Sequence, residues 1–233
     1  MMTDIFSSFD PYTSFLPTNI SPIMFWLISF ITLTIIHSSL WMQSCRYTSI
    51  LYLPTNTMFK QSNRTSLPNL KGSPSLLVSL FFMLIMINFM GLLPYVFSMS
   101  SHLLFTMTFG LPLWLSMILS AAIFYPKKFT AHFLPSGAPD WLNPFLIIIE
   151  TLSTLARPIT LSFRLAANMS AGHIVLGLIG IYATSSLFSS ITNSIILLSI
   201  QSLYLIFEIG ICMIQAYIFC LLLSLYSDDH PNL

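Results

Sequence analysis

Hydrophobic residues are gathered into five long blocks along the chain, separated by short polar or proline-containing stretches. A membrane-spanning helix needs about 20 apolar residues, because the hydrocarbon core is about 30 Å thick. Lipid cannot satisfy open backbone groups, so blocks of this length predict helices. The alternating pattern of a β-barrel strand is absent. The chain is therefore expected to be all-α, with five membrane-embedded helices, at residues 20–41, 75–97, 103–125, 145–181 and 191–226.

A polar stretch at residues 42–73 separates the first block from the helical hairpin of residues 75–125. Within it, residues 50–59 predict a short surface helix interrupted by Pro54. The whole chain of 233 residues is 55% hydrophobic and only 6% charged, whereas a soluble domain is about 25% charged. These values predict one integral membrane domain over residues 1–233, without a separate soluble part.

Composition also limits the expected ligands. The net charge of +1 gives no electrostatic argument for a nucleic-acid partner. The three cysteines have no metal-binding spacing, so neither a metal nor a cofactor is expected. No phosphate-binding loop is present, so the chain is expected to have no catalytic site of its own.

Basic residues predict the orientation in the membrane. They occur in residues 42–73 and at Lys127 and Lys128. Two expected spans separate the first group from the second, so both groups lie on the same side of the membrane. That side is the cytoplasm or the matrix, and the C-terminus returns to it. The N-terminus is expected on the other side. Residues 1–20 contain Asp4 and Asp10 but no Lys or Arg, unlike an Arg-rich transit peptide.

The last two blocks, within residues 145–226, are too long for upright helices. Each has roughly 36 residues and would extend roughly 54 Å as a helix. We therefore expect these helices either to be broken or to be strongly tilted. Pro158 can kink the first of them, but one proline does not remove the excess length.

Both long blocks carry a stripe of polar residues. Ionisable groups inside a membrane usually face protein or water and mark an ion path. Antiparallel pairing of the stripes would bring Gln215 to Arg164 and Glu208 to His173, around a turn near residue 190. Small residues near Arg164 indicate either close packing between the two helices or a groove for a helix of another subunit, and both can hold. The stripes contain Glu150, Arg157, Arg164, Asn168 and His173, then Gln201, Tyr204, Glu208 and Gln215.

Four segments resemble the subunit a family of F-type ATP synthases. Residues 147–173 and 207–219 carry the densest likeness. Asn88-Phe-Met-Gly-Leu-Leu-Pro94 and Ala131-His-Phe-Leu-Pro-Ser-Gly137 are similar to earlier signatures of the family. A histidine at 173 with a carboxylate at 208 resembles the animal mitochondrial members, because bacterial members have the reverse order.

The resemblance implies a proton-translocating stator subunit beside a rotating ring of c subunits. Arg164 would be a fixed cation that favours the ionised form of a passing ring carboxylate and separates two offset half-channels. Glu208 and His173 would relay protons, and Glu150 would belong to the exit path. Asn168 and Gln215 would support Arg164, with Gln201 and Tyr204 on the same stripe.

The implied location is the mitochondrial inner membrane, with the N-terminus toward the intermembrane space and the C-terminus toward the matrix. The implied partners are the c-ring, peripheral-stalk subunit b, small membrane subunits of the complex, lipid and protons. The alternatives are a membrane subunit of a secondary proton-coupled transporter or respiratory complex, and a structural anchor. A transporter would be expected to have repeats or broken helices around a midplane site.

Overall fold

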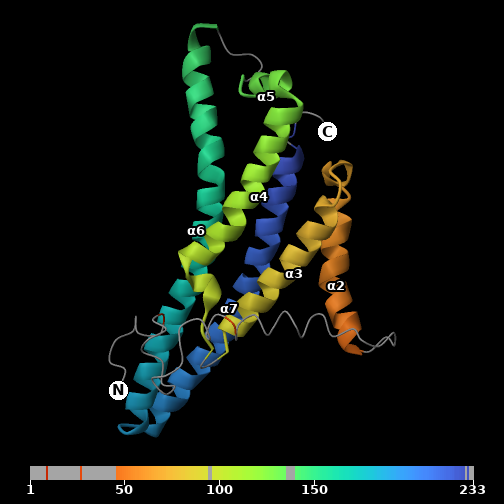
Figure 1. The fold of residues 1–233 in the computed structure, drawn as a ribbon. Coiled ribbons are helices and arrows are strands. Elements are labelled where there is room, and N and C mark those ends of the chain that lie inside the picture. The colour runs from red at the N-terminus through yellow and green to blue at the C-terminus, as the bar shows by residue number, and fades with distance from the viewer. Residues whose placement is uncertain are drawn as a thin grey trace. The chain divides into compact units, whose positions relative to one another are not determined.

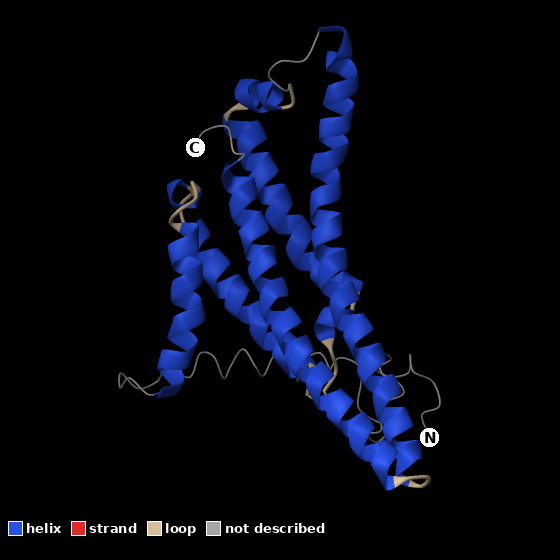
Figure 2. Cartoon of the chain, turned by 180° about the vertical axis from the view of Figure 1, so that it is seen from behind, coloured by secondary structure: helices blue, strands red, loops and turns tan. Residues whose placement is uncertain are grey.

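A computed structural model describes residues 9, 27, 46–93, 96–134, 140–228 and 230, and these contain only helices, turns and loops (Figure 2). The α-helices within these residues are labelled in Figure 1. Three short 3-10 turns accompany them, at Leu67–Asn69, Met99–Ser101 and Asp140–Leu142. The α-helices are α2 (Arg46–Ser62), α3 (Ser73–Gly91), α4 (Leu103–Phe124), α5 (Pro126–His132), α6 (Asn143–Leu187) and α7 (Ile191–Asp228).

Four of these helices, α3, α4, α6 and α7, are long and apolar enough to cross a membrane. They match the last four expected spans. The first expected span, residues 20–41, lies almost entirely outside the described residues, so a fifth membrane helix stays a prediction. The described part of the chain is thus an all-helical protein of the multi-pass membrane type.

Several helices differ from the sequence-based expectation, and α6 continues to Leu187 rather than ending near residue 181. Helix α3 ends at Gly91 rather than near residue 97, and the next two amides bond three residues back in tighter turns. Helix α2 runs unbroken through Pro54, where an interruption was expected. Helix α5 lies between two of the expected blocks, where the sequence analysis placed no helix. It starts at Pro126, and proline suits the first turn of a helix because that amide has no helical partner.

The chain forms two compact units, and α3, α6 and α7 each run from one into the other. The first unit comprises residues 1–44, 83–102 and 165–216, and the second comprises residues 45–82, 103–164 and 217–233. In the second unit α4 packs closely on α6, where Ser162 Oγ donates to Met107 Sδ at 3.0 Å. Gly110 of α4 faces the same part of α6, where an added β-carbon would stand in ordinary van der Waals contact, 3.7 Å from the Pro158 carbonyl oxygen.

The end of α7 is fixed within the second unit by its own set of contacts. Asp228 Oδ1 accepts hydrogen bonds from the Ser66 amide at 2.7 Å and from its hydroxyl at 2.6 Å. Cys220 lies against α3 and directs its thiol toward the Leu77 carbonyl at 3.8 Å. These contacts connect α7 to α3 and to the turn between α2 and α3.

In the first unit, residues 165–187 of α6 and 191–216 of α7 form an antiparallel hairpin with a tight turn (Figure 1). The amides of Ser189 and Ser190 both bond to the Ser186 carbonyl and close the turn. The turn falls at residues 188–190, where the polar spacing predicted it. Both helices are continuous, and α6 runs through Pro158, so the alternative of broken helices does not apply. At about 1.5 Å per residue, the 45 residues of α6 extend about 68 Å, which is longer than the hydrocarbon core of about 30 Å, and the predicted tilt stays a prediction.

Candidate functional site

Arg164 lies in α6 with its side chain exposed. Within the described part of the chain, no carboxylate pairs with its guanidinium. An arginine in a membrane helix is costly and keeps its charge, so it needs a partner outside its own helix. Its exposure is compatible with a partner supplied by another chain.

Glu208 has the opposite environment, because its side chain is only 2% exposed in the first unit. Its carboxyl lies directly against Gly172 of α6, in the place where a larger residue would carry its side chain. Neither carboxyl oxygen has a hydrogen-bond partner among the described residues. A buried carboxyl without a fixed partner can exchange a proton without first breaking a protein hydrogen bond.

His173 follows Gly172 directly in the chain and is half-buried. Its ring meets the edge of the Phe9 ring, with 6.3 Å between centroids. Its Nε2 also has no partner in the described residues, so it forms no direct hydrogen bond with Glu208. The structure therefore places the Glu208 carboxyl beside the neighbour of His173 rather than on the imidazole.

Asn168 and Gln215 join the two helices of the hairpin. Asn168 Nδ2 donates to Gln215 Oε1 at 3.0 Å. One turn further along, the Cys212 thiol meets Met169 Sδ at 3.5 Å. The sequence predicted that Gln215 would meet Arg164, which lies one helical turn before its observed partner Asn168. That predicted contact is not tested here, whereas the hydrogen bond to Asn168 is formed.

Serine and threonine residues of these helices are satisfied within their own helix. Ser170 Oγ donates to the Ala167 carbonyl, and Ser194 Oγ to the Ile191 carbonyl, each three residues back. Such local hydrogen bonds lower the free-energy cost of placing a hydroxyl group in a membrane helix. Glu208 and His173 are longer side chains without such a local bond, which separates them from the ordinary polar residues of the hairpin.

Gln201 and Tyr204 lie closer to the turn than Glu208, in the same helix α7. Both are half-buried, and the Tyr204 ring lies 6.2 Å from that of Phe207. They extend the polar stripe toward the turn, and their predicted supporting role remains a prediction.

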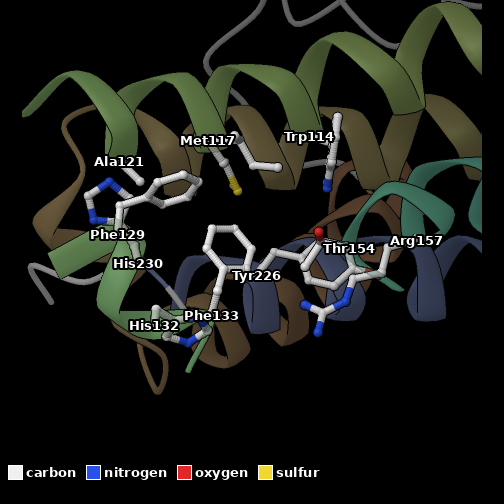
Figure 3. Close-up of a pocket in the computed structure, with 11 residues that line it drawn as sticks. Trp114, Met117, Ala121, Phe129, His132, Phe133, Thr154, Arg157, Tyr226 and His230 are labelled. Carbon is white, nitrogen blue, oxygen red and sulfur yellow. The ribbon is translucent and has the colours of Figure 1, made fainter. Parts of the chain in front are cut away.

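Glu150 lies in the second unit near the start of α6, where Arg157 Nη2 is 3.7 Å from its Oε1. Arg157 also lies over the Tyr226 ring, with 5.3 Å between the guanidinium carbon and the ring centroid. Figure 3 shows Arg157 and Tyr226 among the residues that line a pocket, together with His132 and His230. The sequence predicted Glu150 as a site residue but did not identify Tyr226 as a neighbour of Arg157.

Two further residues of the first unit were not assigned a role from the sequence. Asn88 of α3 is fully buried, and both atoms of its amide lack a partner among the described residues. It was noted only as part of a family-like motif. Gly172 was counted among the small residues, and its contact with Glu208 depends on a side-chain conformation that spacing alone does not specify.

Comparison with known proteins places this chain in a family. A family model described as "ATP synthase A chain" matches residues 20–228. The chain is 39% identical to "ATP synthase subunit a" of Locusta migratoria over 233 residues, covering 98% of this chain and 99% of the relative. It is 40% identical to the protein of the same description from Aedes aegypti over 230 residues, with the same coverage. The chain therefore belongs to the ATP synthase A chain family.

Proposed function

We propose that this chain translocates protons in an F-type ATP synthase and that Arg164 is its fixed charge against a rotating c-ring. Membership of the family supports a proton-translocating subunit of ATP synthase over a transporter or respiratory subunit. The observation that carries the role of Arg164 is its exposure in a membrane helix with no described carboxylate partner. A ring carboxylate that passes this charge is held ionised and gives up its proton.

Glu208 and His173 form the proposed proton entry. Both present buried nitrogen or oxygen atoms without a protein partner in the described residues, and both side chains can bind and release a proton. Arg164 cannot pass a proton, because a guanidinium stays protonated. Entry and exit are therefore kept apart at the arginine, and protons must travel on the ring.

Glu150 belongs to the proposed exit path. Its carboxylate is half-exposed near the start of α6, with Arg157 as a loose partner at 3.7 Å. Asn168 and Gln215 support the site by their hydrogen bond, which fixes the hairpin one turn after Arg164.

The driving force and the partners follow from this mechanism. A membrane potential supplies about 2.3 kcal/mol per proton charge for each 100 mV. The proposed location is the mitochondrial inner membrane, with the C-terminus on the matrix side. The proposed partners are the c-ring, subunit b and small membrane subunits of the complex. Nucleotide chemistry belongs to other subunits of that complex.

Replacement of Arg164 by lysine tests the proposal. Lysine keeps a positive charge but can lose its proton and lacks the planar fork of donors. We expect ATP synthesis driven by an imposed proton gradient to fall at least about tenfold in vesicles containing the intact complex, which is about 1.4 kcal/mol in the barrier.

The matched control is Arg64→Lys, at an exposed position in the turn after α2, which should leave the rate unchanged. A normal rate in the Arg164→Lys complex would show that the arginine is not the essential charge.

A further inference from the structure

Gly172 is the only glycine of α6 whose missing side chain leaves room for another residue. A β-carbon added at Gly172 would overlap Oε1 and Cδ of Glu208 and stand 3.2 Å from its Oε2. At Gly177 and Gly180 of the same helix, an added β-carbon would meet nothing within 4 Å. The notch formed by Gly172 is therefore filled by the Glu208 carboxyl.

Hydrogen bonds from the described residues do not hold this carboxyl in place, since both its oxygens lack such partners. Because Glu208 is only 2% exposed, packing against the surrounding atoms sets the position of its carboxyl group. Small residues in membrane helices usually let two backbones approach each other. At Gly172 the space accommodates a carboxyl group instead.

The neighbouring residue makes this position relevant to proton transfer. His173 follows Gly172 in the chain. The notch therefore keeps the Glu208 carboxyl at the same height along α6 as the residue that carries the imidazole. A proton that moves between the two groups needs a short and constant distance.

We propose that Gly172 is a positioning residue, whose notch holds the Glu208 carboxyl in the conformation that takes part in proton entry. This inference rests on the proposed function of Glu208. A methyl group at position 172 displaces the carboxyl into another rotamer while the helices keep their places, because the overlapping atoms are the far end of a flexible side chain. Alanine is also a better helix former than glycine, by about 1 kcal/mol, so α6 itself is not weakened.

The test compares Gly172→Ala with Gly177→Ala and Gly180→Ala in vesicles containing the intact ATP synthase. The three substitutions are chemically identical and lie within eight residues of α6. We expect Gly172→Ala to lower proton-driven ATP synthesis about 10- to 100-fold, because a displacement of about 1 Å can cost about 100-fold in rate. The two control variants should keep the wild-type rate, and all three complexes should assemble equally.

A second background separates positioning from a structural effect. Aspartate is one methylene shorter, so in the Glu208→Asp background the carboxyl does not reach the notch. We expect Gly172→Ala to cause no further loss in that background. An equal loss in both backgrounds would show that the methyl group acts on packing and would overturn the proposal.

A chemical readout does not depend on the rate of synthesis. A hydrophobic carbodiimide modifies accessible carboxyl groups, and mass spectrometry measures the adduct on Glu208. We expect Gly172→Ala to increase this modification severalfold over Gly177→Ala, because the carboxyl leaves its notch. Equal modification and equal rates in the two variants would overturn the positioning role. A normal rate in Glu208→Gln would instead reject the proposed function of Glu208, which is a separate result.

Discussion

At the scale of single residues, the polar side chains of this protein differ in how their hydrogen-bonding capacity is met. Hydroxyl groups bond to their own helix, and Asn168 bonds across the hairpin to Gln215. Glu208 and His173 keep unpaired buried atoms among the described residues, and Arg164 is exposed. A group that must change its proton or its partner during function is best left outside a static hydrogen bond. The three residues proposed for proton movement meet this condition.

His230, just after α7, provides a test of pH dependence outside the membrane helices. Burial lowers the pKa of His230 below its ordinary value of 6.5, and its Nε2 lies 3.3 Å from Ser120 Oγ. The unfolded chain therefore binds more protons than the folded chain as the pH falls below 6.5. Stability decreases in that window.

We expect the thermal stability of the purified complex to decrease between pH 7.5 and pH 5.5, and His230→Phe to reduce this decrease. Phenylalanine fills a similar volume and does not titrate. Unfolding temperatures of wild type and variant at both pH values provide the measurement. A variant that loses as much stability on acidification as the wild type would show that His230 does not contribute.

At the scale of elements, the spacing of polar residues predicted a turn near residue 190, and α6 and α7 are separated by residues 188–190. Residues seven apart on α7 form one stripe, because seven residues nearly complete two helical turns. The same spacing fixes pairing only to within about one turn, and the structure shows a hydrogen bond from Asn168 to Gln215, one turn after Arg164, while the predicted contact of Gln215 with Arg164 stays a prediction. Helix α2 extends beyond the predicted residues 50–59 at both ends, and it continues through Pro54, where an interruption was predicted.

The Gly172 notch could not be predicted from the sequence for a different reason. Its meaning depends on the rotamer of Glu208, a residue 36 positions later in the chain. Sequence spacing places the two helices side by side but does not set side-chain torsions. The exposure of Arg164 and the burial of Glu208 likewise required the structure, since both residues lie in similar apolar surroundings along the chain.

The hairpin register can be tested by cross-linking within one chain. Met169 lies against the native Cys212, with 3.5 Å between the two sulfur atoms. We expect Met169→Cys to be joined to Cys212 by a short thiol-specific cross-linker in most chains. Ala171→Cys is the control, since residue 171 is exposed and lies about 200° around the helix from residue 169. Peptide mapping identifies the linked pair, and linkage from residue 171 in place of residue 169 would show a rotated helix.

At the scale of the whole molecule, the exposed residues of α6 near Arg164 are the important feature. The side chains of Phe163, Arg164, Ala167 and Ala171 are all exposed, although they belong to an apolar helix. Lipid tails can cover the apolar side chains of this set, but they offer no hydrogen-bond acceptor or counter-charge to an arginine inside the bilayer. A neighbouring subunit that carries a carboxylate satisfies both requirements. We therefore predict that these exposed residues of α6 face a partner subunit that supplies the compensating charge.

The identity of that partner can be tested in the intact complex with a photoreactive group attached to a single cysteine. We expect Ala167→Cys, three residues after Arg164, to give a covalent adduct with the c subunit. Ile123→Cys on α4 is the control, because residue 123 is 71% exposed on a different helix and should label equally well without this adduct. Mass spectrometry identifies the attached chain. Adducts with lipid alone from residue 167, or equal capture of the c subunit from residue 123, would place the ring elsewhere. Arg164 would then need another counter-charge, and separation of the two proton paths could not depend on it.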